Sequence, residues 1–352
     1  MVFKVYRSIL PLEKDWEALC RAGSDMTPYQ SFAWNRNMVA CYRSNIYTFT
    51  RFSLRFLVGY EDGKARVIAP LAIPKQKYRN SIHVQLLGEY SKSGALNVIY
   101  DDDVTNDDFA ALTDEIIRLW GACDIRFLEL SDRSKFEHFL AASSRFVKRG
   151  DRICVGSEIP ESAEDCYSLL SKSVRQTLRT SYNRLERDHA SISIEIHDRG
   201  YAFSEEERAV LSELYNKRLR EWNEPTLQSG GSSPLRKLLH LAFPAKDSFY
   251  SFSQDPHFTY VKCIINGKIA AYFFALHDDN GYYIVPTLIH DTDFDQYSPG
   301  LLMINRFLKQ KTEQNGIQRF DLSRGNEPYK TRFTPLPYAY RNNDYGVIRA
   351  EH

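Results

Sequence analysis

The chain has 352 residues, of which 43% are hydrophobic and 13% aromatic, so it can bury a large core and is not disordered as a whole. Its 46 Lys and Arg nearly balance its 45 Asp and Glu, which argues against a general nucleic-acid binder and predicts no DNA partner. Six cysteines without a Cys-x-x-Cys pair disfavour a disulfide framework or a zinc site, and we expect no metal. The longest apolar run, residues 269–276, is far shorter than the roughly 20 residues of a membrane helix, and no secretory signal pattern opens the chain. We expect a cytoplasmic protein without an integral membrane segment.

The sequence of the first half predicts two helices at its start and then a β-hairpin. The helices cover residues 12–22 and 31–42, and the hairpin strands cover 54–60 and 65–73. An Asp-Gly pair separates these strands, and type I′ hairpin turns favour it because both central residues need positive φ. An amphipathic helix over 109–120 and a strand over 125–130 follow.

The second half repeats this order. Its hairpin strands, 260–265 and 268–276, flank Asn266-Gly267, and a strand over 282–288, a helix over 299–314 and a strand over 317–322 follow. The last strands of both halves end alike, in Glu-Leu-Ser and Asp-Leu-Ser. We interpret this as a duplicated α/β unit, with an α/β (α+β) fold and domains at residues 1–156 and 157–352. A helical insertion (164–188 and 204–222, then a Gly/Ser-rich 228–233 and a short helix from Ser233) separates the halves.

The helix of the second half begins with the stretch Tyr297-Ser298-Pro299-Gly300-Leu301. Ser298 is a good N-cap, Pro299 fits the first helical position, and Gly300 leaves backbone amides uncovered. Such a helix start can bind an anion, for example a pyrophosphate. The alternative is that these residues only cap a helix.

The matching helix of the first half has carboxylates at its start. Three aspartates precede it, and Asp107 and Asp108 enter its first turn. They suit the helix dipole but repel a pyrophosphate. A nucleotide-like donor is therefore expected in the second half, and the first half is expected to be structural or substrate-facing.

Charged and polar residues follow the last strand of the second half. Asp321 and Glu327 are candidate bases, and Tyr329 is a candidate acid for a leaving thiolate. Arg324 and Lys330 are candidates for holding phosphate or carboxylate groups. The alternative is a charged surface turn in which Tyr329 packs in the core.

A basic helix is predicted over residues 172–188, with Val174, Leu178, Tyr182 and Leu185 as its buried stripe. Arg175 and Arg179 lie on its other side and are candidates for binding a phosphorylated substrate, although a solvated helix face is the common explanation of such a run. None of the nine histidines has metal-ligand spacing, and His290 is interpreted as a bystander.

Together these pieces resemble the GNAT acyltransferase superfamily, and within it the tandem-GNAT, CelD-like branch of cellulose and exopolysaccharide biosynthesis, related to the Fem-type aminoacyltransferases. The resemblance rests on short motifs in order: Leu86-Leu-Gly88, Ser173-Val-Arg-Gln-Thr-Leu-Arg179, Asn266-Gly267 with Ala270-Ala271, Tyr297-Ser-Pro-Gly300, and Phe320-Asp-Leu-Ser-Arg-Gly325 with Glu327, Tyr329 and Lys330. The sequence departs from the family in its pyrophosphate loop, which keeps a single glycine, and in having His189-Ala190 after the basic helix.

The resemblance implies two GNAT-like mixed-sheet domains, the second binding acyl-CoA with its pantetheine along residues 282–288 and its pyrophosphate at Gly300. The expected function is transfer of an acetyl or other acyl group, with acetyl-CoA as the expected donor, to an amine or hydroxyl of a small-molecule or glycan-precursor acceptor in surface polysaccharide synthesis. No covalent enzyme intermediate is expected. Two alternatives stay open, a Fem-type transferase that uses aminoacyl-tRNA and a non-catalytic scaffold in a polysaccharide synthesis assembly.

Overall fold

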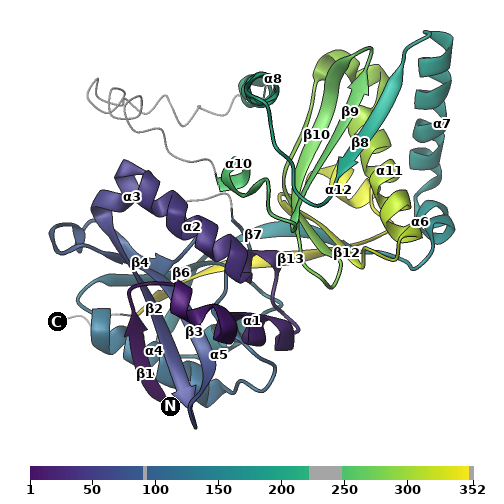
Figure 1. Cartoon of the computed structure of the whole chain (residues 1–352). Helices are drawn as coiled ribbons and strands as arrows, with labels where there is room; N and C mark the ends of the chain where they lie inside the picture. The colour runs from purple at the N-terminus through teal and green to yellow at the C-terminus, as the bar shows by residue number, and fades with distance from the viewer. Residues whose placement is uncertain (90–92, 222–247, 349–352) are drawn as a thin grey trace. The chain divides into compact units, whose positions relative to one another are not determined.

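The computed structural model describes residues 1–89, 93–221 and 248–348. These form two compact units (Figure 1). Unit 1 contains residues 1–154 and 340–348, and unit 2 contains residues 155–221 and 249–339. The expected assignment of residues after 339 to the second domain is corrected, because they complete unit 1. The predictions for Trp222, 228–233 and the helix from Ser233 lie outside the described residues.

Unit 1 is a mixed sheet with helices around it. Its helices are α1 (Glu13–Ala22), α2 (Phe32–Ser44), α3 (Ile46–Arg51), α4 (Asn106–Trp120) and α5 (Lys135–Ala142), with 3-10 turns η1 (Leu10–Leu12), η2 (Pro28–Gln30) and η3 (Gln76–Tyr78). Its strands are β1 (Val2–Tyr6), β2 (Phe52–Glu61), β3 (Lys64–Pro74), β4 (His83–Leu86), β5 (Ile99–Tyr100), β6 (Asp124–Ser131) and most of β7 (Phe146–Glu158).

Unit 2 is also a mixed sheet between helices. Its helices are α6 (Ala163–Leu169), α7 (Lys172–Arg187), α8 (Glu205–Glu221), α10 (Ser248–Phe252), α11 (Pro299–Glu313) and α12 (Pro328–Arg332), with the 3-10 turn η4 (Thr292–Tyr297). Its strands are β8 (Ile192–His197), β9 (Phe258–Ile265), β10 (Lys268–His277), β11 (Tyr282–His290), β12 (Arg319–Arg324) and the start of β13 (Leu336–Val347).

The two units share one topology. In unit 1 an antiparallel hairpin, β2–β3, leads through β4 and α4 to β6, which pairs parallel with β4. In unit 2 the hairpin β9–β10 leads through β11 and α11 to β12, which pairs parallel with β11. The matched order supports the duplication that the sequence predicts. The final strands are exchanged, because β6 of unit 1 has β13 as its neighbour and β12 of unit 2 has β7.

Both hairpin predictions are confirmed. Asp62 and Gly63 have φ values of 49° and 78°, and Asn266 and Gly267 have values of 50° and 76°. These are the left-handed conformations of a two-residue type I′ turn, which Asn, Asp and Gly adopt at low cost. The turn residues therefore fix the register of both ladders.

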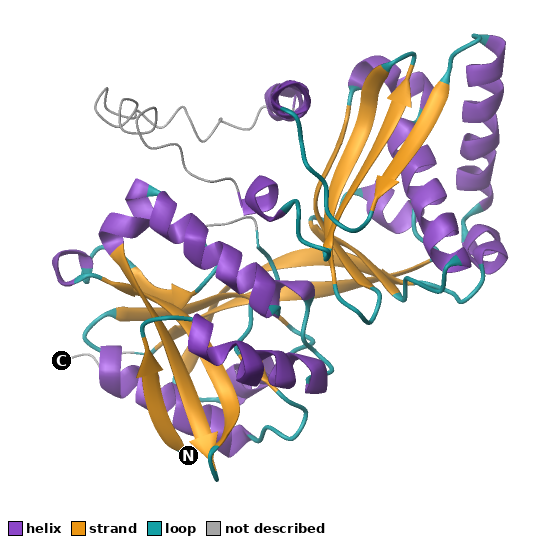
Figure 2. Ribbon diagram, viewed as in Figure 1, coloured by secondary structure: helices purple, strands orange, loops and turns teal. Residues whose placement is uncertain are grey.

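The core of unit 2 has helices on both faces of its sheet (Figure 2). Alternate residues of β10 point to opposite faces, so Phe273 packs on Phe307 of α11 while Phe274 packs on Tyr250 of α10. The face of α11 also carries α6 and α7, and the other face carries α8 and α10 (Figure 1). A strand buried on both faces reads as a continuous apolar run, which explains residues 269–276 without a membrane span.

The insertion between the halves agrees with its prediction in part. The basic helix expected over residues 172–188 is confirmed as α7, and the helical stretch before it is the separate helix α6, because the Ser171 hydroxyl caps a new helix start by accepting from the N–H of Val174. On α7 the buried stripe includes Ser181 instead of Tyr182, whose side chain is 48% exposed. The insertion also holds a strand, β8, whose alternating Ile-Ser-Ile-Glu-Ile-His pattern signals it in the sequence.

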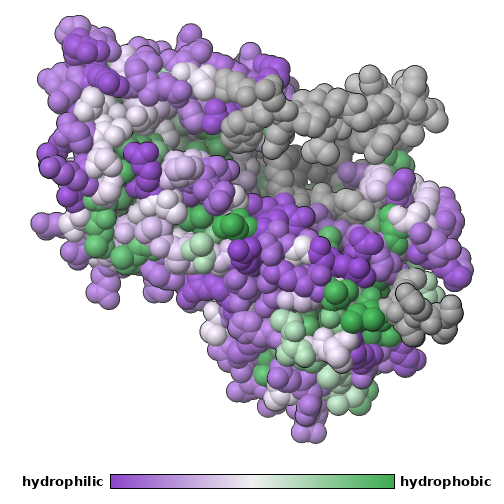
Figure 3. Space-filling model, turned by 180° about the vertical axis from the view of Figure 1, so that it is seen from behind, coloured by the Kyte–Doolittle hydropathy of each residue, from purple (hydrophilic) through white to green (hydrophobic). Residues whose placement is uncertain are grey.

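The surface is mainly polar on the face drawn in Figure 3, where hydrophobic residues form separate groups. Among the described residues no helix combines the length and hydropathy needed to span a membrane.

Candidate functional site

Strands β11 and β12 part at their carboxyl ends. They pair only from Tyr282 opposite Arg319 to Ile284 opposite Asp321, although β11 continues to His290. A β-bulge on the β10 side falls at the same point, and Pro286, which has no N–H to donate, lies within it. The strands therefore diverge and leave a wedge at the edge where α/β folds place ligands.

The start of α11 borders this wedge, but Ser298 does not cap it with its side chain. Ser298 is left-handed (φ 50°, ψ 54°), and the N–H groups of Leu301 and Leu302 both donate to its carbonyl oxygen. The predicted hydroxyl cap is therefore wrong, because the left-handed backbone turns the side chain away from the first-turn amides. Among the described residues, the N–H of Gly300 has no hydrogen-bond partner.

Gly300 is buried, and the space beside it is open on the scale of a methyl group. A Cβ built on Gly300 would have only Leu288 Cδ2 nearby, at 4.0 Å. Two cavities of unit 2, of about 750 and 510 Å³, are lined by other residues and do not reach Gly300. The helix start thus offers one unpaired amide and a cradle that a side chain would narrow.

The equivalent helix start in unit 1 is closed by its own side chains. The Asp108 carboxylate accepts from the N–H and hydroxyl of Thr105, and the Thr105 hydroxyl accepts in turn from the N–H of Asp108. This capping box uses the N–H of Asp108 and places a carboxylate at the helix start. The two helix starts thus differ in what lies at their first turn, and an anion site in the second half alone stays a prediction.

Basic residues surround the start of α11, but they are not the ones singled out in the sequence. Arg184 donates to the carbonyl oxygen of Gln296 at 2.8 Å, and Tyr297 donates to Asp188 at 3.0 Å. The hydrogen bond of Arg187, with that of Tyr297, lowers the pKa of Asp188. The carboxyl end of α7 therefore lies beside the start of α11.

Arg175 and Arg179 lie on the earlier turns of α7, away from that contact. Arg175 donates to the carbonyl oxygen of Ser168, at the end of α6, and Arg179 is exposed. Much of the length of α7 thus lies between these two arginines and the helix end that is beside Gly300. Its orientation, which the sequence does not reveal, decides which basic residues accompany the helix start.

Asp321 lies where β11 and β12 still pair and is completely buried. Tyr282 donates to one of its oxygens at 2.9 Å and the N–H of Ser323 to the other at 2.6 Å. Burial, reinforced by the charge of Asp321, raises the pKa of Tyr282 well above its usual value, so Tyr282 stays a donor. Asp321 is held as a buried hydrogen-bonded anchor at the root of the wedge.

Ser323 is a site residue that the sequence reasoning passed over. Its φ is 57°, a strained value for a serine, and its hydroxyl is buried without a hydrogen-bond partner. Left-handed serines therefore stand on both sides of the wedge, Ser298 at α11 and Ser323 at β12. An unpaired buried hydroxyl and local strain are both typical of ligand sites.

The remaining predicted residues lie on the turn after β12. Glu327 is exposed and pairs with Lys330 at 3.1 Å, while the buried ammonium of Lys330 also contacts the carbonyl oxygens of Ser323, Arg324 and Gly325. Lys330 therefore holds the loop together, which corrects its expected substrate-binding role. Arg324 is exposed at the edge of the wedge.

Tyr329 is half-buried and packs against Phe333 at 5.6 Å. Burial, followed by the charge of Glu327, raises its pKa, while Arg218 of α8 opposes the shift. Lys217 of the same helix binds Asp291, directly after β11, at 2.5 Å. The end of α8 therefore adds two cations to the site, which no motif in the sequence indicated.

Comparison with known proteins agrees with this geometry. Residues 172–331 match the family model described as an acetyltransferase (GNAT) domain. No curated protein matches the sequence.

Solved structures share the fold of the whole chain. A crystal structure of FemX has a TM-score of 0.63 at 11% identity, covering 99% of this chain and 98% of FemX. A tandem GNAT protein from the clavulanic acid biosynthesis pathway has a TM-score of 0.52 at 10% identity, covering 99% and 100%. The C-terminal domain of a putative lysylphosphatidylglycerol synthetase from Agrobacterium fabrum has a TM-score of 0.52 at 13% identity, covering 97% of this chain and 93% of that domain. Such identities show the fold alone.

In the described residues no group of three or more His, Cys, Asp or Glu is placed to hold a metal ion. The parted strands, the open helix start and the family match all fall in unit 2. Residues 172–331 of this chain therefore match a GNAT acetyltransferase domain in sequence, and the chain has a fold of two GNAT-like units.

Proposed function

We propose that unit 2 transfers an acyl group from acyl-CoA, with acetyl-CoA as the first donor to test, to an amine or hydroxyl of a sugar or envelope-polymer precursor. The observation that carries the proposal is the wedge between β11 and β12 beside the unpaired N–H of Gly300. Gly300 adds no side-chain bulk at the helix start where a pyrophosphate would approach, and the helix dipole favours its charge. Arg184 adds positive charge nearby.

The residues around the wedge suit a direct transfer. The acceptor amine or hydroxyl forms a bond to the acyl carbon, the thioester C–S bond breaks, and the thiolate takes a proton. Tyr329 stays protonated because its pKa is raised, so it suits the acid that supplies this proton. Glu327 is exposed and can take the acceptor's proton directly or through a water, and Asp321 holds the strand ends in place.

Ser323 and Arg324 are the groups we propose to contact the reacting molecules. The unpaired Ser323 hydroxyl lies at the root of the wedge and can donate to an acyl or acceptor oxygen. The exposed Arg324 can hold an acidic group of the acceptor. A role in surface polysaccharide synthesis, and membership of the CelD-like branch, are supported by the sequence motifs alone.

Calorimetric titration of acetyl-CoA into the full chain tests the proposal. We expect a 1:1 site, and release of free CoA in the presence of amino sugars. A Fem-type transferase would instead retain aminoacyl-tRNA in a steeply salt-dependent way and release no CoA. Binding of neither donor would favour the scaffold and end the enzymatic proposal.

A further inference from the structure

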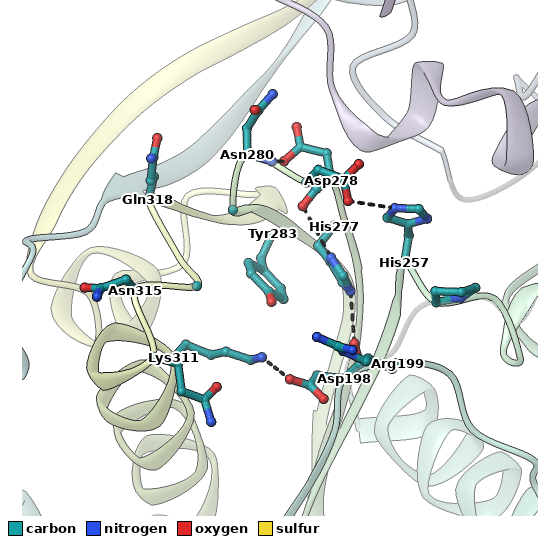
Figure 4. A pocket seen from close by; sticks show the side chains of 15 residues that line it. Asp198, Arg199, His257, His277, Asp278, Asn280, Tyr283, Lys311, Asn315 and Gln318 are labelled. Atoms are coloured by element: carbon teal, nitrogen blue, oxygen red, sulfur yellow. Dashed lines mark hydrogen bonds and ion pairs between the residues drawn. The ribbon is translucent and has the colours of Figure 1, made fainter. Parts of the chain in front are cut away.

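A second cavity of unit 2, of about 750 Å³, lies at the other end of β11 from the wedge. It is lined at the amino ends of β11 and β12 and at the carboxyl end of α11, by residues that include Tyr283 and Lys311 (Figure 4). Five residues of strand separate Tyr283 from Leu288, the residue beside Gly300, or about 17 Å at 3.3 Å per residue. The cavity is therefore distinct from the candidate donor site, and its volume suits a small metabolite.

The charged groups at the cavity are of both signs, and most of them are paired with one another. Lys311 is buried and pairs with Asp198. His257 contacts Asp255 at 3.2 Å and Asp279 at 3.3 Å, and these hydrogen bonds, the first outweighing the effect of burial, raise its pKa to about 9.

Asp278 closes its own turn by accepting from the N–H groups of Asn280 and Tyr282, at 2.9 Å each, and burial raises its pKa. His277 is kept neutral, because burial lowers its pKa. Arg199 is exposed and has neither an ion pair nor a hydrogen bond within the described part of the chain. Arg199 is thus the cation of this cavity that is available to a ligand.

The hydroxyl of Tyr283 is also free to bind. The side chain is 3% exposed, yet the hydroxyl has no hydrogen-bond partner among the residues described, and Figure 4 shows it directed into the cavity. The hydroxyl is accessible from the cavity, so a ligand that enters the cavity can accept a hydrogen bond from it. Burial, together with the charges of Asp198 and Asp278, raises the pKa of Tyr283, so it remains a donor.

Three donors point into this space in Figure 4, the hydroxyl of Tyr283, the ammonium of Lys311 and the guanidinium of Arg199. Lys311 uses one of its N–H groups on Asp198 and lies over the Tyr283 ring, 5.7 Å from its centroid. We propose that this cavity binds a small ligand through an oxyanion group, carboxylate or phosphate, held by Tyr283, Lys311 and Arg199. The neutral stack of His277 on Tyr283, 4.8 Å between centroids, forms the adjoining wall for the rest of the ligand.

Thermal unfolding of the full chain with inorganic phosphate and with citrate tests this proposal, with NaCl at equal ionic strength as the reference. We expect one of the two anions to raise Tm above the NaCl reference, and the stronger one identifies the oxyanion class. The Arg199→Gln and Tyr283→Phe variants should each lower the affinity for the anion at least tenfold. The phenylalanine keeps the packing of the tyrosine ring. Arg306→Gln, which removes an exposed arginine of α11 outside this cavity, should bind like the original chain.

Two results would overturn the proposal. One is the absence of any stabilisation beyond that of NaCl, or equal stabilisation of the Arg199→Gln and Tyr283→Phe variants. The other is loss of anion binding in a Gly300→Asp variant, because the anion would then occupy the candidate donor site. Retained binding in Gly300→Asp supports the cavity whether or not the proposed transfer activity exists.

Discussion

A charge placed at Gly300 should discriminate between an anion-binding helix start and a merely structural one. Gly300 is the second residue of α11, its φ is not in the left-handed region, and a Cβ there has only Leu288 Cδ2 nearby. We therefore expect Gly300→Ala, Gly300→Asn and Gly300→Asp to fold. The aspartate should even favour the helix by about 0.3–1 kcal/mol, because a carboxylate suits the first turn.

The effect on acyl-CoA follows from the same geometry. A carboxylate about 5 Å from a phosphate costs about 0.8 kcal/mol at a dielectric constant near 80 and about 3.3 kcal/mol near 20. Gly300→Asp should therefore bind acyl-CoA about 4- to 260-fold more weakly than Gly300→Asn, which has the same shape without the charge. The difference should shrink at high salt, where the Debye length falls from about 10 Å at 0.1 M to about 3 Å at 1 M.

Calorimetry at two salt concentrations measures these affinities, and thermal unfolding checks the fold. Gln310→Glu, which adds a carboxylate near the other end of α11, is the matched control and should bind acyl-CoA normally. Equal affinities of the asparagine and aspartate variants at low salt would refute the reasoning, because shape alone would then account for the effect. The reasoning would also be refuted if Gly300→Asp bound acyl-CoA as tightly as the original chain does.

Four further predictions follow from the described contacts. Ser323→Ala should lower kcat/KM about tenfold without lowering Tm, since removing an unpaired buried hydroxyl costs no hydrogen bond within the protein; unchanged kinetics would remove Ser323 from the site. Tyr282→Phe should destabilise the fold by about 1.5–3 kcal/mol in urea unfolding, since Asp321 loses a charged hydrogen bond, and Asp321→Asn in the same chain should recover part of it; a change below about 0.5 kcal/mol contradicts this. His257 has a folded pKa of about 9, above its unfolded value near 6.5, so its stabilisation is complete below pH 6.5 and is lost as the pH rises through 9; the loss should be about 1 kcal/mol after solvent screening and absent in His257→Gln. Burial raises the pKa of Cys263 to about 12, so iodoacetamide should label it only after unfolding, and an acyl adduct on Cys263 in the native chain would refute direct transfer.

Much of the fold was readable because its signals are local. The two hairpins follow from Asp62-Gly63 and Asn266-Gly267, and α4 and α11 follow from their helical periodicity. The exchange of β7 and β13 could not be predicted, because the pairing of strands far apart in the sequence has no local sequence signal. The strand β8 was readable in principle from its alternating pattern, but the surrounding helices hid it.

The candidate site was predictable only where neighbouring residues form it. Gly300 and the turn after β12 follow predicted strands closely in the sequence, so the ends of these strands indicated where the site lies. Arg184 and Lys217 belong to helices whose packing direction decides what they reach. Lys330 shows the converse limit, since its residue type suits a substrate as well as the three carbonyl oxygens that it contacts.

The exchanged strands affect the order in which this protein can be built. Asn342 lies opposite Ser131 in the ladder between β13 and β6. The sheet of unit 1 is therefore incomplete until the ribosome has made a strand more than 200 residues after β6. During synthesis the open edge of β6 is exposed to wrong partners, which is when chaperones are most useful. A frameshift near residue 339 would consequently damage the early half of the polypeptide at least as much as the late one.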